Sequence, residues 1–140
     1  MARILAIDYG SKRVGLAVTD PNQMIATGLA TVDTKEIIVF LKTYIGKEPV
    51  ERFIVGDAMH LDGTPAQSAP MIEAFIKILQ KEFPEIPVGR IDERFTSKMA
   101  FQTMIDSGIG KMKRRDKKLV DKISAVLILQ SYLETKGKSF

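Results

Sequence analysis

Acidic residues end several of the apolar runs in this sequence. Asp8 follows RILAI, Asp57 follows FIVG, and the adjacent pair Asp92 and Glu93 follows IPVGRI. Carboxylates that meet at one edge of a sheet repel one another unless a cation holds them together or they share protons. Hard divalent ions such as Mg²⁺ take a few carboxylates, keep waters and bind phosphate oxygens. These residue types therefore indicate metal-assisted hydrolysis of a phosphate ester.

A further carboxylate, Asp121, falls inside a helical pattern near the end of the chain. Ser124 and Ala125 follow it by three and four residues, so the three share one helix face. Small residues on that face let a helix approach a sheet closely, and Asp121 would then point at the sheet edge. The alternative is a local ion pair with a neighbouring cation, which would be Lys117, Lys118 or Lys122.

Each strand-end carboxylate also has an ordinary structural interpretation. Aspartate is common in turns, where its side chain binds the local backbone. Asp92 and Glu93 are adjacent, so strand alternation directs them to opposite faces and at most one enters a site on one face. Arg94 could be a simple ion-pair partner of Glu93.

Positive charge is concentrated late in the chain. Residues 1–88 hold 9 Lys/Arg and 11 Asp/Glu, whereas residues 89–140 hold 12 and 6. The run KMKRRDKK (111–118) alone has six cations and one anion. Such clusters bind polyanions through counterion release, although they also occur as solvated loops or helix starts.

Composition excludes several classes of protein. A chain of 140 residues fits one domain, so residues 1–140 are expected to fold as a unit. The 45% hydrophobic and 27% charged residues indicate a soluble globular chain, and zero cysteines exclude disulfides and thiolate metal sites. No signal peptide and no apolar run of about 20 residues is recognisable. We expect a cytoplasmic protein with no membrane partner.

The apolar pattern predicts a mixed α/β sheet. Strands are predicted over residues 3–9, 14–19, 24–32, 53–57 and 86–92, and helices over 35–45, 66–82, 96–107 and 117–134. Thr34 is expected to cap the first helix, and Gly28 to weaken the third strand or mark a bulge. The order implies three antiparallel strands followed by parallel strands with crossover helices. Ligands bind such sheets at the carboxyl ends of the parallel strands.

Helical spacing also predicts which side chains are buried. The expected apolar faces are Ile37, Ile38, Leu41 and Ile45 in the first helix; Ile72, Phe75, Ile76 and Leu79 in the second; and Leu119, Ile123, Val126, Gln130 and Leu133 in the last.

Four blocks in a fixed order carry a family resemblance. They are DYGSKRVGLAVTD (8–20), VGDAMHLDGT (55–64), DERFTS (92–97) and VDKISAVLILQSYL (120–133). The chain resembles the YqgF/RuvX family of the ribonuclease H-like superfamily, nucleases similar to Holliday junction resolvases and linked to maturation of the 5′ end of 16S ribosomal RNA. The resemblance covers nearly the whole chain. It implies a ribonuclease H-like fold, with a five-stranded mixed sheet flanked by helices.

The resemblance also implies a site. Asp8, Glu93 and Asp121 match acidic positions that are catalytic and hold Mg²⁺ or Mn²⁺, while Arg94, Thr96 and Ser97 match positions that shape or line the site. The candidate nucleic-acid-binding residues lie within two of the family blocks or in the basic run at residues 111–118. They are Lys12, Arg13, Arg94, Thr96, Lys111, Lys113, Arg114, Arg115, Lys117 and Lys118.

One block departs from the family pattern. The family commonly has GLP followed by an Asn-rich stretch, whereas this chain has GDAMHLDGT. Asp57 stands where leucine is usual, and His60 is the only histidine. We favour a strand-end role for Asp57 and a solvated loop position for His60. Relatives that resolve junctions use four carboxylates, so a fourth ligand is left open.

Two other functions are weighed against a nuclease. Sugar kinases and actin-like ATPases carry a similar D-x-G hairpin, but they need two domains facing a cleft, and this chain is too short. A non-catalytic RNA-binding module would have lost an acidic ligand, and 7% aromatic residues are too few for a base-stacking sheet.

The residues and the resemblance together predict a two-metal-ion nuclease, and precursor 16S ribosomal RNA is the substrate that the resemblance implies. A resolvase of four-way DNA junctions is the alternative. The cleavage mode, endonuclease or exonuclease, is left open, as is the choice between monomer and homodimer.

Overall fold

The computed structural model describes residues 2–57, 69–92 and 117–137. The strands are β1 (Arg3–Tyr9), β2 (Arg13–Thr19), β3 (Ala26–Asp33), β4 (Val50–Asp57) and β5 (Val88–Asp92). The helices are the 3-10 turn η1 (Thr34–Glu36), α1 (Ile37–Lys47), α2 (Ala69–Glu82) and α5 (Lys117–Gly137). The helix predicted over residues 96–107 lies outside the described residues. No helix in the described ranges combines the length and apolarity needed to cross a membrane.

The five strands form one mixed sheet in the order β3-β2-β1-β4-β5. The pairs β1–β2 and β2–β3 are antiparallel, and β1–β4 and β4–β5 are parallel. This confirms the predicted fold class, in which a meander is followed by crossover strands. Strands β1, β4 and β5 therefore run in the same direction and have their carboxyl ends at the same edge of the sheet.

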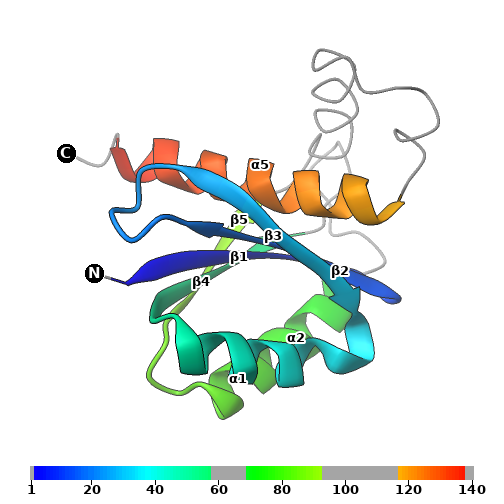
Figure 1. The fold of residues 1–140 in the computed structure, drawn as a ribbon. Coiled ribbons are helices and arrows are strands. Elements are labelled where there is room, and N and C mark those ends of the chain that lie inside the picture. Colours follow the sequence, from blue (N-terminus) through cyan, green and yellow to red (C-terminus); the bar gives the residue numbers. More distant parts are fainter. Residues whose placement is uncertain (1, 58–68, 93–116, 138–140) are drawn as a thin grey trace.

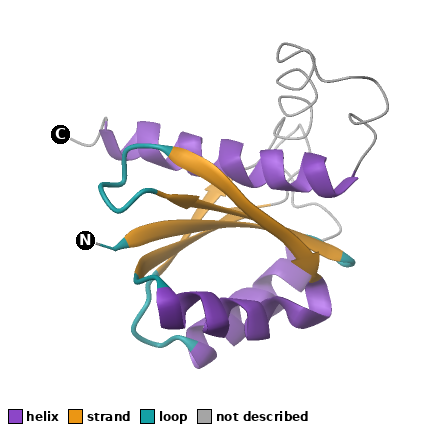
Figure 2. Ribbon diagram, in the orientation of Figure 1, coloured by secondary structure: helices purple, strands orange, loops and turns teal. Residues whose placement is uncertain are grey.

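The helices cover both faces of the sheet (Figure 1). Helix α5 runs along one face, and α1 and α2 pack on the other (Figure 2). Alternate residues of β1 divide between two cores: Leu5 and Ile7 pack with α1 and α2, whereas Ile4 and Ala6 pack with α5. A strand buried on both sides explains why its sequence is continuously apolar.

Most element bounds differ from the predictions by only a few residues. Strand β4 begins at Val50 instead of residue 53, because its first residues pair with the start of β1 although Glu51 and Arg52 are polar. The buried residues of α2 are the four predicted ones, Ile72, Phe75, Ile76 and Leu79. In α1, Ile37 and Leu41 are buried as predicted, and Ile38 and Ile45 pack against the core while partly exposed.

The predicted face of the last helix is confirmed only in part: Val126 and Leu133 pack against the core while partly exposed, whereas the predicted Gln130 is exposed. Among the side chains of α5 that the structure describes, the buried ones are Ser124, Ala125, Ile128 and Leu129. Small residues lie under α5 on the sheet, including Ala6 and Ala17, so the helix packs through its own small residues at short range. The expectation that Ser124 and Ala125 permit close approach is thus confirmed.

Thr34 does not cap α1. The first residue before α1 is Glu36, which makes no side-chain capping bond, and the Thr34 hydroxyl donates instead to the carbonyl of Gly10 at 2.7 Å. The Thr34 N–H also donates to the carbonyl of Lys12 at 3.1 Å. Thr34 therefore fastens the end of β3 to the turn between β1 and β2.

The bulge expected near Gly28 is present. Leu16 pairs with Ala30 and Ala17 pairs with Gly28, so Leu29 is the extra residue on β3. A Cβ atom on Gly28 would lie 2.8 Å from Cγ of Lys122. The glycine thus leaves room for the aliphatic part of a lysine from α5.

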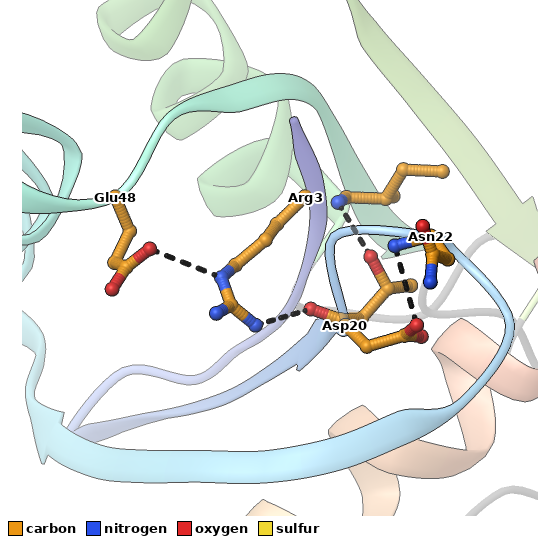
Figure 3. Close-up of polar contacts among 6 residues, drawn as sticks. Arg3, Asp20, Asn22 and Glu48 are labelled. Carbon is orange, nitrogen blue, oxygen red and sulfur yellow. Dashed lines mark hydrogen bonds and ion pairs between the residues drawn. The ribbon is translucent and has the colours of Figure 1, made fainter. Parts of the chain in front are cut away.

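Polar contacts fasten the end of the sheet where β1 begins (Figure 3). Arg3 Nε donates to Glu48 Oε2 at 3.4 Å, and Arg3 Nη1 donates to the carbonyl of Thr19 at 2.9 Å. The Ile4 N–H donates to the Thr19 hydroxyl at 2.9 Å. These contacts tie β1 to the end of β2 and to the residue after α1.

Candidate functional site

The carboxyl end of β1 leads into a tight turn. The N–H of Gly10 donates to the carbonyl of Arg13 at 3.0 Å, and a Cβ on Gly10 would lie 2.7 Å from that oxygen. Glycine is therefore required for the chain to reverse here. Thr34, directly after β3, also donates hydrogen bonds to the carbonyls of Gly10 and Lys12, so β3 helps to fix the turn. The hairpin around Asp8 is thus a fixed part of the sheet edge.

Strand alternation puts Asp8 on the face covered by α5. Ile4 and Ala6 pack with α5 residues, and Asp8 is the next member of the same set. In Figure 1, β1 ends on the side of the molecule where α5 begins. Asp8 is partly exposed, unlike the four buried residues before it. It therefore lies at the rim of the core, as the sequence predicts.

Gly15 is the common neighbour of Asp8 and Asp121. Gly15 is the cross-strand partner of Asp8 on β2. A Cβ atom on Gly15 would lie 2.1 Å from the carbonyl oxygen of Asp121 and 3.2 Å from its Cβ. Only glycine lets α5 come so close. Two carboxylate-bearing residues from opposite ends of the chain are brought together over this residue.

The carboxylate of Asp121 is paired with an arginine from the hairpin. Arg13 Nε donates to Asp121 Oδ2 at 3.0 Å, with the two side chains 28% and 26% exposed. The sequence left Lys117, Lys118 and Lys122 open as partners of Asp121, whereas the ion pair found among the described side chains joins Asp121 to Arg13. Sequence reasoning missed both this ion pair and the role of Gly15, although the glycine inside the apolar strand VGLAVT was a visible signal.

Asp57 and Asp92 end β4 and β5 as cross-strand partners. Their positions belong to the alternating set of Phe53, Val55 and Val88, which faces α1 and α2. Ile54 and Ile91 belong to the set that faces α5. The register thus separates the positions of Asp57 and Asp92 from that of Asp8, in accord with the strand-end interpretation of Asp57.

The other predicted site residues divide into two groups. Lys12 is exposed in the turn, and Lys117 and Lys118 form the first residues of α5. The remaining candidates lie outside the described residues: Glu93, Arg94, Thr96, Ser97, Lys111, Lys113, Arg114 and Arg115, together with His60.

The donor chemistry of the described part suits a hard divalent ion. Asp8 and Asp121 offer carboxylate oxygens, the ligands that Mg²⁺ and Mn²⁺ prefer. Within residues 2–57, 69–92 and 117–137, no group of three or more acidic, histidine or cysteine residues forms a complete metal site. Among the described residues, Asp8 and Asp121 thus lie together on the α5 face, with Arg13 bound to Asp121.

The comparisons with known proteins agree with this architecture. RuvC from T. thermophilus, solved in complex with a Holliday junction substrate, superposes with a TM-score of 0.57 at 16% identity, covering 98% of this chain and 97% of RuvC. A second T. thermophilus RuvC structure gives a TM-score of 0.55 at 15% identity, covering 96% of each chain. These likenesses establish the fold.

Sequence relatives are much closer. A protein of Christiangramia forsetii named "Putative pre-16S rRNA nuclease" is 59% identical over 133 residues, covering 95% of this chain and 98% of the relative. A protein of the same name from Porphyromonas gingivalis is 54% identical over 134 residues, covering 96% and 97%. A family model described as "RuvX: Holliday junction resolvase" matches residues 2–135. The chain therefore belongs to the RuvX family.

Proposed function

We propose that this protein is a divalent-metal-dependent nuclease that hydrolyses phosphodiester bonds at the 5′ end of precursor 16S ribosomal RNA. The observation that carries the proposal is the convergence of Asp8 and Asp121 over Gly15, on one face of a ribonuclease H-like sheet. The names of the close relatives supply the substrate class. This substrate would place the protein in the cytoplasm, as one domain over residues 1–140.

Asp8, Glu93 and Asp121 are the proposed ligands of Mg²⁺ or Mn²⁺. Of the adjacent pair Asp92 and Glu93, the position of Asp92 falls in the set that faces α1 and α2. This supports Glu93 as the member of the pair that joins Asp8. The bound ions would supply a water nucleophile at neutral pH and neutralise charge on the phosphate. Departure of the 3′-oxygen then leaves a 5′-phosphate product.

Cations around this edge would hold the nucleic-acid backbone. Lys12 is exposed in the turn after Asp8, and Lys117 and Lys118 open α5 one turn before Asp121. The run at residues 111–118 carries six of the 21 Lys and Arg residues of the chain. Contacts of this kind position a substrate without reading its sequence, so they suit RNA and DNA alike.

A substrate comparison tests the proposal. Metal-free protein is given an RNA that spans the 5′ end of precursor 16S ribosomal RNA, or a four-way DNA junction of equal length, in Mg²⁺, in Mn²⁺ or in EDTA. The proposal expects RNA cleavage with either ion and none in EDTA. Absence of RNA cleavage with both ions would contradict it.

Two alternatives have distinct outcomes in the same experiment. The family description favours a junction resolvase, for which symmetric cuts in the DNA and a dimer in a sizing measurement are expected. An RNA-binding module would retain RNA in EDTA and cleave neither substrate with any ion.

A further inference from the structure

The ion pair between Arg13 and Asp121 joins two proposed functional residues. Its Nε to Oδ2 distance of 3.0 Å is that of a charge-assisted hydrogen bond, and both side chains are more than two thirds buried. Screening by water and salt is weaker at such a site than for a fully exposed pair. Arg13 is therefore an electrostatic partner of Asp121.

Backbone contacts fix both ends of this pair. The carbonyl of Arg13 accepts the N–H of Gly10 at 3.0 Å, within the turn that Thr34 also holds. The backbone of Asp121 rests on Gly15, two residues after Arg13. The two side chains thus start from positions that the fold determines, which lowers the entropy cost of pairing them.

Arg13 and the neighbouring Lys12 differ in placement. Arg13 is partly buried and belongs with Gly15 and Ala17 to the set that faces α5, whereas Lys12 is exposed in the turn. The planar guanidinium binds a carboxylate or a phosphate with similar geometry. Arg13 is thus suited to exchange one anion for the other.

The guanidinium of Arg13 occupies Oδ2 of Asp121 with one hydrogen bond, and its positive charge beside the carboxylate opposes binding of a divalent ion there. We propose that Arg13 is a positioning residue that competes with the metal ion for Asp121. It neutralises Asp121 and holds it in place in the metal-free protein, and it gives up the carboxylate when an ion binds. The released guanidinium then faces the substrate phosphate. This inference rests on the proposed function, because it assigns Asp121 to a metal site.

Mn²⁺ affinity of the full chain measures this competition without reference to activity. Free Mn²⁺ is followed by electron paramagnetic resonance in titrations of wild-type protein and the Arg13→Gln variant at low ionic strength. We expect Arg13→Gln to bind Mn²⁺ about twofold to fivefold more tightly, the range that an ion pair of this exposure can contribute. We also expect a lower melting temperature without metal and a larger rise on adding Mn²⁺.

Another ion pair formed by a strand arginine provides a matched control. Arg3 binds Glu48 through the same Nε atom at 3.4 Å, at the opposite end of β1 (Figure 3). Arg3→Gln removes the same charge and also an ion pair, so it should lower the melting temperature. Its Mn²⁺ affinity should equal that of wild type.

Unchanged or weaker Mn²⁺ binding in Arg13→Gln overturns the inference. If that variant does not fold, Arg13→Met replaces it, since methionine keeps an unbranched side chain without the charge; a Mn²⁺ affinity equal to that of wild type then contradicts the inference. Asp8→Asn separates the two proposals. If wild type binds Mn²⁺, Asp8→Asn binds it more weakly and Arg13→Gln binds it as tightly as wild type, only this inference is contradicted and the proposed function stands. Absence of Mn²⁺ binding by wild type would end the proposed function as well.

Discussion

At the scale of single residues, Gly15 determines how closely α5 approaches the sheet. Its missing side chain leaves space for the carbonyl of Asp121, which would lie 2.1 Å from any Cβ. Real Cβ atoms do not come so near to backbone oxygen, so any larger residue must displace the helix. The proximity of Asp8 and Asp121 therefore depends on a residue that carries no chemistry itself.

Gly15→Ala should destabilise the protein and separate the two carboxylates. Overpacking against backbone has no flexible side chain to yield, so we expect a loss of about 3 kcal/mol in the free energy of unfolding, the upper part of the usual range. Urea denaturation followed by circular dichroism measures this loss.

Gly46 in α1 provides the control for this substitution. No atom lies within 4 Å of a Cβ built on Gly46. Gly46→Ala should stabilise the helix by about 0.5–1 kcal/mol through propensity alone. Equal effects of the two substitutions would show that α5 is not held against Gly15.

Some residue-level features could be predicted from the sequence and others could not. Asp8 ends a continuous apolar run, so its place at a strand end was predictable. The partner of Asp121 was not, because local spacing offers only Lys117, Lys118 and Lys122, while Arg13 is 108 residues away. Only the packing of α5 on β2 brings that pair together.

At the scale of elements, α5 shows where hydrophobic periodicity is insufficient. Its larger apolar residues predicted one face, but the helix buries Ser124 and Ala125 together with Ile128 and Leu129. Where a helix packs closely on a sheet, small side chains are favoured at the contact. A pattern of large apolar residues does not reveal such small buried residues. The faces of α1 and α2 were predictable because those helices pack through large residues.

The connection between β2 and β3 is organised by Asp20. Its carboxylate accepts the backbone N–H groups of Ile25 and Met24, each at 2.8 Å, and of Asn22 at 3.2 Å. These bonds, with Ile25 as the largest cause, lower the pKa of Asp20 below its ordinary value of 3.8. Its charge therefore stabilises the fold above pH 3.8, and this contribution is lost as the pH falls through the lowered pKa.

Asp20→Asn tests this linkage, because asparagine keeps an acceptor oxygen and removes the charge. The variant should melt below wild type at pH 7, and the difference should shrink as the pH falls below the ordinary pKa of 3.8. Melting temperatures measured from pH 7 to strongly acidic solution check it. A difference that stays constant over this range would mean that the charge contributes nothing.

The basic run at residues 111–118 is predicted to bind the RNA backbone. Replacing Lys113, Arg114 and Arg115 with glutamine should weaken RNA binding. It should also reduce the slope of log affinity against log salt by about 2, for three lost phosphate contacts on single strands. Fluorescence anisotropy in EDTA at several salt concentrations measures the slope.

A control triple variant removes the same charge elsewhere. Lys35, Lys47 and Lys81 are exposed on the side of the sheet that carries α1 and α2. Their replacement should leave the slope nearly unchanged. If both triple variants behave alike, the basic run acts only through net charge.

At the scale of the whole molecule, the topology explains why β1 and α5, from opposite ends of the chain, pack against each other. Strand β1 is central in the sheet, so its carboxyl end lies beside that of β4 and at the same edge as that of β5. Helix α5 begins near that edge and then runs along one face of the sheet (Figure 1). The combination of antiparallel and parallel strands was predictable from the order of strands and helices along the chain, whereas the strand order in the sheet and the close packing of α5 required the structure.

The rate at which the Asp8→Asn variant cleaves RNA, compared with wild type, is the most direct test of the nuclease proposal. Asparagine keeps the size of the side chain and removes the charge that would hold a divalent ion. We predict unchanged circular dichroism and at least about a 100-fold loss of Mg²⁺-dependent cleavage of precursor 16S ribosomal RNA. A folded Asp8→Asn protein that cleaves at the wild-type rate would contradict the account.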